Sequence, residues 1–185
     1  MSTTVTISTP LRESDLHSLR IGDRVLIRGT VYTARDAAHR RFIGLIAAGK
    51  KLPIDLDGQI IYYTGPAPAR PGEVIGPAGP TTSGRLDPYT VPLLEAGLKG
   101  MIGKGNRGPE IIEAIKKHSA VYFAATGGAA VLLSRQIRKA VVAAYGDLGP
   151  EAVLRLEVID FPVIVAVDTS GRNLYREGPE AYRNL

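Results

Sequence analysis

The chain has 185 residues, of which 44% are hydrophobic and 22% are charged, and its formal net charge is +5. This length fits one domain with its own core, and no apolar run in the sequence approaches the ~18–20 residues that a membrane-spanning helix requires. The absence of cysteine excludes disulfides, a thiolate nucleophile, and thiolate ligands on this chain for zinc or an iron–sulfur cluster.

The charged residues, the histidines and the first residues argue against nucleic-acid binding, a metal site and secretion. Lysines and arginines are scattered and interrupted by acids, and this argues against a nucleic-acid-binding surface. The three histidines, His17, His39 and His118, stand too far apart for a local metal site. We expect His39 at the surface or behind a site residue, and His118 at an exposed helix end. The first residues lack the basic start and apolar stretch of a secretory signal, so we expect a cytoplasmic protein.

The first half of the chain alternates between helical and extended patterns. Four elements are predicted here. A proline after a capping threonine starts a helix from Thr9 to Gly22, and apolar residues at helical spacing indicate a helix over 35–49. Extended patterns indicate strands over 24–34, which is rich in β-branched residues, and over 58–65. The next segment, PAPARPGEVIGPAGP (66–80), holds too many prolines and glycines for regular structure. Loops of this length in a compact domain tend to be functional.

The second half continues the alternation. The same signals predict a helix over 88–97, a strand over 98–103, a helix from Pro109, a strand over 120–125, a helix over 129–140, and strands within 152–175 joined by a hairpin turn at 168–171. Strands that alternate with helices and end in antiparallel hairpins indicate a mixed α/β domain with more than one sheet layer.

Four turns beside predicted helix starts carry polar or cationic side chains, namely residues 34–36, 81–85, 103–107 and 126–128. Because helix N-termini offer free N–H groups and a positive dipole end, these turns together predict an anion site. The planar fork of arginine makes two parallel bonds to a carboxylate. Arg35 and Arg85 could therefore hold the two carboxylates of one ligand.

Each of these turns also has a purely structural interpretation. The arginines could form ion pairs within the chain, Arg85 with Asp87 or Glu95, and Arg35 with Asp36 or Asp55. The glycines at 127 and 128 could simply let a helix pack closely on the sheet. The stretch GMIGKG (100–105) does not meet the phosphate-loop pattern, because leucine stands at 98 and glycine at 105 where glycine and a hydroxyl residue are required.

Five stretches resemble the β subunit, or the equivalent C-terminal domain, of the iron–sulfur-dependent class I fumarase and tartrate dehydratase family: TARDAAHRR (33–41), GPAGPTTSGRLDPYT (76–90), LKGMIGKGNR (98–107), YFAATGGAA (122–130) and EVIDFPVIVAVD (157–168). The resemblance implies one swivelling β/β/α domain over residues 1–185. It also implies docking on an α subunit that carries a [4Fe–4S] cluster, in an α2β2 assembly, with the active site at their junction. The cluster's ligands then lie on the α subunit, and this chain alone binds no metal.

The resemblance also implies roles for individual residues. Arg35, Arg85 and Lys104 match residues that bind the substrate's carboxylates, and Thr81 matches the residue proposed as the base that takes the carbon-bound proton. Threonine needs nearby cations to lower its pKa, and Arg85 and Lys104 could supply them. The implied reaction is the reversible hydration of fumarate to (S)-malate, with iron as the Lewis acid. A β subunit of L(+)-tartrate dehydratase or mesaconate hydratase, and a non-catalytic dicarboxylate-binding domain, remain as alternatives.

Overall fold

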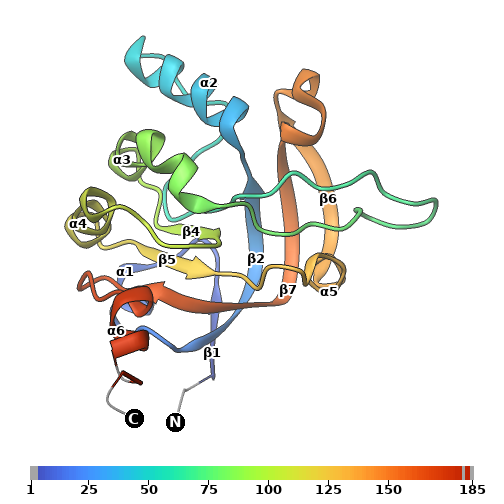
Figure 1. Cartoon of the computed structure of the whole chain (residues 1–185). Helices are drawn as coiled ribbons and strands as arrows, with labels where there is room; N and C mark the ends of the chain where they lie inside the picture. Colours follow the sequence, from blue (N-terminus) through green and yellow to red (C-terminus); the bar gives the residue numbers. More distant parts are fainter. Residues whose placement is uncertain (1–3, 181, 184–185) are drawn as a thin grey trace.

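The computed structural model describes residues 4–180 and 182–183, in which strands form one mixed sheet with helices along its side (Figure 1). The strands are β1 (Thr4–Ser8), β2 (Arg24–Thr33), β3 (Ile60–Tyr62), β4 (Gly100–Gly103), β5 (Val121–Ala124), β6 (Ile137–Ala144) and β7 (Val153–Val167). The α-helices are α1 (Glu13–His17), α2 (Asp36–Ala47), α3 (Asp87–Glu95), α4 (Pro109–Lys117), α5 (Ala130–Ser134) and α6 (Leu174–Glu180), and the 3₁₀ helices are η1 (Ser83–Leu86) and η2 (Gly146–Glu151). The expected α/β class is confirmed, and the arrangement is consistent with a swivelling β/β/α domain.

Strand β7 closes the sheet on itself. Strands β2, β3, β4 and β5 pair in parallel, and β7 pairs antiparallel with β5 and also with β2, so that these five strands form a barrel. Ile164 of β7 is in register with both Arg24 of β2 and Ala124 of β5. Strands β1 and β6 extend the sheet beside β2 and β7. The layers of sheet expected from the sequence are therefore opposite walls of one closed sheet, because one long strand pairs with both edges of the parallel row.

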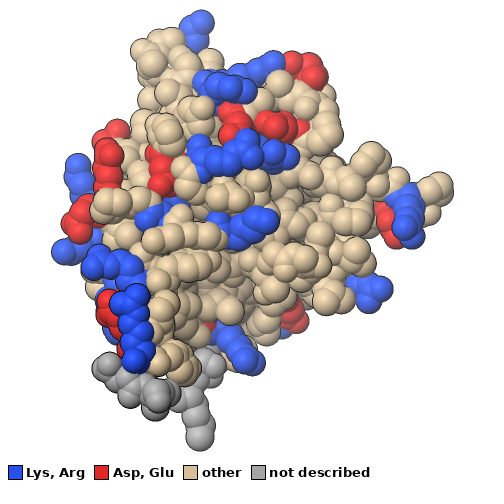
Figure 2. All heavy atoms as spheres, viewed as in Figure 1, with Lys and Arg blue, Asp and Glu red and all other residues tan. Residues whose placement is uncertain are grey.

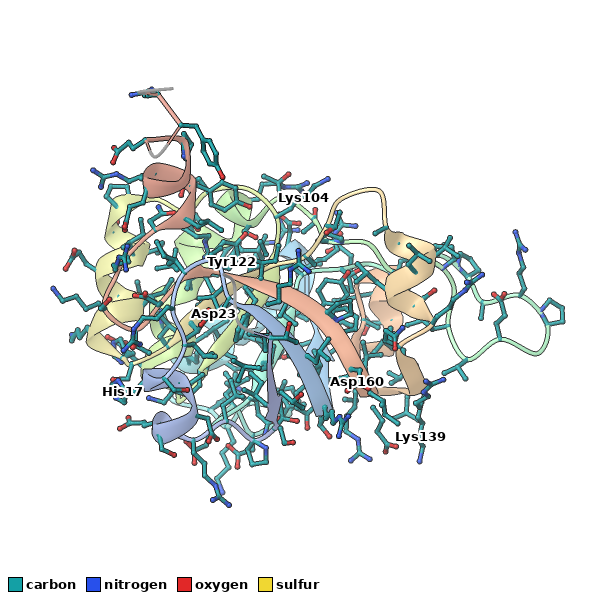
Figure 3. All side chains as sticks on the ribbon, turned by 90° about the horizontal axis from the view of Figure 1, so that it is seen from below. His17, Asp23, Lys104, Tyr122, Lys139 and Asp160 are labelled. Atoms are coloured by element: carbon teal, nitrogen blue, oxygen red, sulfur yellow. The ribbon has the colours of Figure 1, made fainter. Side chains whose placement is uncertain are left out.

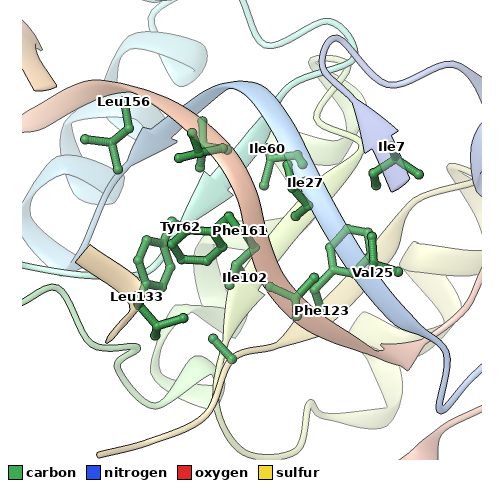
Figure 4. Close-up of a cluster of buried hydrophobic side chains, with 14 of the residues drawn as sticks. Ile7, Val25, Ile27, Ile60, Tyr62, Ile102, Phe123, Leu133, Leu156 and Phe161 are labelled. Atoms are coloured by element: carbon green, nitrogen blue, oxygen red, sulfur yellow. The ribbon is translucent and has the colours of Figure 1, made fainter. Parts of the chain in front are cut away.

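The interior of the barrel is apolar. Figure 4 shows side chains from β2, β3, β4, β5 and β7 meeting there, and the rings of Tyr62 and Phe161 lie with centroids 5.3 Å apart. A second apolar cluster fills the space between the outer face of the sheet and helices α2, α3 and α4, and includes Phe42, Leu93, Ile115 and Met101. Strands β3, β4 and β5 are thus covered on both faces, as parallel strands usually are.

The parallel strands place several connections at one edge of the barrel. Because the carboxyl ends of β2, β3, β4 and β5 point the same way, the segments that follow them meet at that edge. The segment after β3 includes the expected irregular loop, whose base is closed by a bond from Ala67 N to Pro77 O (3.0 Å). Figure 1 shows this loop extending past β6, away from α2, α3 and α4. Among the described residues, no helix has the length and apolarity to cross a membrane.

The structure near the start of the chain differs from the expectation in two ways. The helix expected from Thr9 begins only at Glu13, because Thr9 N donates to Arg28 O and Leu11 N to Gly58 O, which holds this backbone against β2 and the turn before β3. Strand β1 was not predicted, although TVTIS alternates as a strand does, and it pairs in parallel with the first half of β2.

Two expectations in the second half are also wrong. The helix expected over 129–140 ends at Ser134, and β6 follows, because its backbone pairs with β7 from Ile137 to Ala144. The turn at 168–171 forms as expected, with Gly171 N donating to Asp168 O (2.9 Å). However, it leads into the helix α6 in place of a second hairpin strand.

Candidate active site

The four residues that the resemblance singles out all lie at the carboxyl edge of the parallel strands. Arg35 follows β2 and is the N-cap residue of α2. Lys104 directly follows β4. Thr81 and Arg85 belong to the segment that returns from the loop after β3. We call residues 81–87 the Thr81 turn and residues 104–108 the Lys104 turn.

Backbone hydrogen bonds hold the Thr81 turn beside the Lys104 turn. Thr81 N donates to Tyr63 O (2.7 Å), and Lys104 N donates to Thr81 O (3.1 Å). Ser83 N in turn donates to Lys104 O (2.8 Å). The Thr81 hydroxyl, on a half-buried residue, and the exposed Lys104 therefore come from directly adjacent backbone segments.

Lys104 lies against the glycines that follow β5. A Cβ at Gly127 would come within 3.6 Å of Lys104 Cδ and 4.0 Å of Lys104 Nζ. These are ordinary contact distances, so the Lys104 side chain extends directly alongside Gly127. Lys104 lies at the edge of the molecule in Figure 3, whereas Asp160 and Lys139 lie on the opposite side.

Arg85 connects the Thr81 turn to the start of α2. Its Nη2 lies 3.1 Å from Asp36 Oδ2, and the side chain remains 55% exposed. Arg85 does form an ion pair within the chain, but with Asp36 and not with the expected Asp87 or Glu95. More than half of its surface remains accessible to a ligand.

The ion pair of Arg35 is longer than that of Arg85. Its Nη2 lies 3.8 Å from Glu151 Oε1, so the expected partners Asp36 and Asp55 are wrong here also. The other Glu151 oxygen accepts from Ala37 N (2.8 Å) in the first turn of α2. Arg35 Nε is buried without a hydrogen-bond partner in the described residues. Buried donors are normally satisfied, so the unpartnered nitrogen shows that the hydrogen bonding of Arg35 is incomplete within the described residues.

The charge pattern of this face matches these contacts. Figure 2 shows lysine and arginine side chains in a band near the middle of the face, with acidic side chains directly above it, close to the start of α2. Of the carboxylates that pair with the arginines, Asp36 was expected beside Arg35 and not Arg85, and Glu151 was missed from the sequence. Asp36 stands next to Arg35, whereas Glu151 comes from η2, far along the chain, and no local signal indicates it.

His39 lies behind Arg35. The imidazole has no exposed surface, and Nδ1 lies 2.8 Å from Arg35 O. Burial, aided by the nearby Arg107 guanidinium, lowers the pKa of His39 to about 4, so the ring is neutral and donates from Nδ1. A surface position for His39 is thus wrong, and the ring lies behind Arg35. His118 ends α4 and is half-buried.

The residues of this chain do not fit an iron–sulfur cluster. The sequence contains no cysteine, and within residues 4–180 and 182–183 no group of three or more histidine, aspartate or glutamate side chains is placed to hold a metal ion. The four site residues are three cations and one hydroxyl, which suit an anion and not a metal. A cluster at this edge would need ligands from another polypeptide or segment.

Comparisons with known proteins agree with these features. The sequence model of the family described as "Fumarase C-terminus" matches residues 1–178. "Fumarate hydratase class I, anaerobic" of Escherichia coli (strain K12) is 38% identical over 178 residues, which cover 94% of this chain and 32% of that protein. "Fumarate hydratase 2" of Leishmania major is 39% identical over 158 residues, which cover 84% of this chain and 28% of that protein. The chain thus spans about a third of the length of these two relatives.

A third relative has nearly the same length as this chain. The "Putative L(+)-tartrate dehydratase subunit beta" of Methanocaldococcus jannaschii is 37% identical over 173 residues, which cover 90% of this chain and 89% of that protein. The match of the family to almost the whole sequence, together with these relatives, shows that the chain belongs to the fumarase C-terminus family.

Proposed function

We propose that this chain is the β subunit of a two-subunit hydro-lyase that reversibly hydrates fumarate to (S)-malate. The observation that carries the proposal is the convergence of Arg35, Arg85, Lys104 and Thr81 at one edge of the barrel, in a chain of the fumarase C-terminus family. Three cations suit a dicarboxylate, and one hydroxyl is available for proton transfer.

The arginines and the lysine bind the two carboxylates of the substrate. The exposed fork of Arg85 donates to one carboxylate while Asp36 holds its far side, and the 26% exposed side chain of Arg35 binds the other. Lys104 adds a point charge beside Thr81. The ion pairs with Asp36 and Glu151 orient both arginines before substrate binds, which lowers the entropy lost on binding.

Thr81 acts on the carbon-bound proton. In the dehydration direction the deprotonated Thr81 Oγ1 takes a proton from the carbon next to the hydroxyl-bearing carbon. The C–H electron pair forms the double bond, and the hydroxyl leaves with the electrons of the C–O bond. Lys104 and Arg85 stabilise the anionic oxygen of Thr81 and so lower its pKa. We assign stabilisation of the departing hydroxyl to the partner's side of the site, since none of these four residues is assigned to bind or protonate it.

The partner is an α subunit that carries the [4Fe–4S] cluster, in an α2β2 assembly. Two observations support a separate partner: the chain lacks ligands for the cluster, and it covers 89% of a relative named as a β subunit. The fumarate hydratases that it matches are about three times longer. The same relative named as a β subunit favours L(+)-tartrate dehydration as the second candidate reaction.

Reconstitution tests the proposal. The chain purified alone should be folded, colourless and without hydratase activity. Co-expression with the cognate α subunit and anaerobic purification should give a brown complex that converts fumarate to malate faster than it converts L(+)-tartrate or mesaconate. Faster turnover of L(+)-tartrate would make the second candidate correct, and turnover by the isolated chain would overturn the two-subunit assignment.

A further inference from the structure

One buried hydroxyl bonds both turns of the candidate site. Tyr122 of β5 has no exposed surface, and its hydroxyl donates to Gly105 O (2.8 Å) in the Lys104 turn. The same oxygen lies 2.8 Å from Ser83 Oγ in the Thr81 turn. Since Tyr122 Oη donates its single proton to Gly105, Ser83 must donate to Tyr122. Figure 3 shows Tyr122 deeper in the molecule than Lys104.

A buried ion pair makes a second connection between the same turns. The Arg107 side chain has no exposed surface, and its Nε lies 2.5 Å from Asp87 Oδ1. Asp87 Oδ2 accepts from Gly108 N (2.8 Å), so the carboxylate of the Thr81 turn binds two groups of the Lys104 turn. The Arg107 guanidinium lies 5.2 Å from the centroid of the Tyr122 ring, which places the two connections in contact.

These connections are not explained by stability alone. This ion pair has lost all of the hydration of Arg107 and most of that of Asp87, whose side chain is 20% exposed, and apolar residues of similar volume often stabilise a fold equally well. Packing here leaves no spare room either, because a Cβ at Gly103 would overlap Ser83 Oγ. Polar contacts with fixed directions are what a site needs when a hydroxyl and two cations must keep one geometry.

We propose that the Tyr122 hydroxyl, with the Arg107–Asp87 pair beside it, is a positioning unit that fixes the Thr81 turn against the Lys104 turn. The unit touches no substrate. It acts through Ser83 and Gly105, the neighbours of the groups that do. This inference rests on the proposed function, in which Thr81 and Lys104 must act on one substrate. A displacement of about 1 Å at such a site can lower the rate about a hundredfold.

Tyr122→Phe is the sharpest test, because it keeps the buried ring and removes only the hydroxyl. In the reconstituted complex it should lower kcat for fumarate by about tenfold to a hundredfold. Ser83→Ala should lower kcat by less, because it removes one of the two bonds. The double variant should match Tyr122→Phe, since both changes remove the same contact. Val25→Ala is the control, because Val25 is buried at the other end of β2, away from both turns.

Two readouts separate positioning from general destabilisation. Tyr122→Phe and Val25→Ala should lower Tm, but only Tyr122→Phe and Ser83→Ala should lower kcat. Hydrogen exchange of the Ser83 and Lys104 amides, which bond across the two turns, should accelerate at least about tenfold in Tyr122→Phe and not in Val25→Ala. If Tyr122→Phe does not fold, the same measurements of kcat and hydrogen exchange on Ser83→Ala test the proposal.

The outcomes also separate this inference from the proposed function. Normal kcat and unchanged exchange in Tyr122→Phe and Ser83→Ala would overturn the positioning unit while leaving the hydratase intact. A wild-type complex that does not hydrate fumarate would overturn the proposed function. The exchange measurement on the full chain would still decide whether the Tyr122 hydroxyl holds the two turns together.

Discussion

The guanidinium of Arg85 and the carboxylate of Asp36 lie 3.1 Å apart, from Nη2 to Oδ2, and join the turn after β3 to the first turn of α2. This pair uses one side of a planar, five-donor group and leaves the rest of the fork exposed. Asp36 thereby fixes the direction in which the free side of Arg85 points. Substrate binding to Arg85 can then proceed without loss of the ion pair.

Arg85→Lys should lower kcat/KM for fumarate by about a hundredfold, although the charge is kept. One ammonium cannot bond Asp36 and present a parallel pair of N–H groups to a carboxylate, and each lost charge-assisted bond is worth about 1.5–3 kcal/mol. Steady-state kinetics of the reconstituted complex measures the effect. Arg28→Lys is the matched control, because Arg28 also pairs with an aspartate, Asp160, at 2.7 Å and lies outside the site. Equal kinetics of the two variants would refute carboxylate binding by the Arg85 fork.

Thr81→Ala should lower kcat at least about a hundredfold with little change in KM. Removal of a general base typically costs ~10²–10⁴-fold in rate, whereas loss of a neutral hydrogen bond costs only about tenfold. Thr81→Ser keeps the hydroxyl and should recover much of the rate. Thr82→Ala, at the exposed neighbouring threonine, should remain close to wild type. A raised KM with normal kcat in Thr81→Ala would mean that the hydroxyl only binds substrate.

Gly103→Ala should lower the free energy of unfolding by about 1–3 kcal/mol, as overpacked cores do. The new Cβ would overlap Ser83 Oγ and come within 3.0 Å of Tyr63 Cδ2. Gly44→Ala offers the opposite case, because no atom lies within 4 Å of the new methyl group in the middle of α2. It should raise stability by about 0.5–1 kcal/mol. Urea unfolding of the three proteins measures both changes, and a destabilised Gly44→Ala protein would contradict the packing described here.

His39 should make the protein less stable as the pH falls from 7 to 5. Burial lowers the pKa of the folded-state imidazole to about 4, whereas the unfolded chain keeps a value of about 6.5. Between these values the unfolded chain binds more protons than the folded one, so acidification favours unfolding. The contribution over this range is about 2 kcal/mol. Urea titrations of wild type and His39→Gln at both pH values test this, and equal pH slopes would argue against a buried neutral His39.

Much of the first two-thirds of the fold follows from local sequence patterns. The strand expected over 24–34 is β2 (Arg24–Thr33), and the helix expected from Pro109 is α4 (Pro109–Lys117). The same patterns predicted strand structure within 152–175, where β7 lies, but β6 (Ile137–Ala144) was beyond them. Its alanines and charged residues favour a helix by intrinsic propensity, but pairing with β7 makes a strand of Ile137–Ala144. Non-local pairing of this kind leaves no periodic signal in the segment itself.

In the candidate site, too, short motifs identify the residues themselves but not the residues that they contact from distant parts of the sequence. Arg35, Thr81, Arg85 and Lys104 could be named from motifs because each stands in a short, distinctive stretch. Their partners could not. The Arg35–Glu151 contact joins α2 to η2, and the burial of Arg107 depends on Asp87 in another segment. Those contacts follow from how the strands are ordered in the barrel, which local patterns do not specify.

The closure of the barrel by β7 also constrains how the chain reaches its native state. A ribosome releases residues 153–167 after all of the parallel strands, so β2 has no antiparallel neighbour until β7 has been made. Contacts between segments so distant in sequence slow folding, because the intervening chain must be ordered before they form. Until then the apolar inner faces of β2 and β5 lie open to other chains. The pairing of β7 with both β2 and β5 therefore covers apolar faces that would otherwise favour aggregation of the nascent protein.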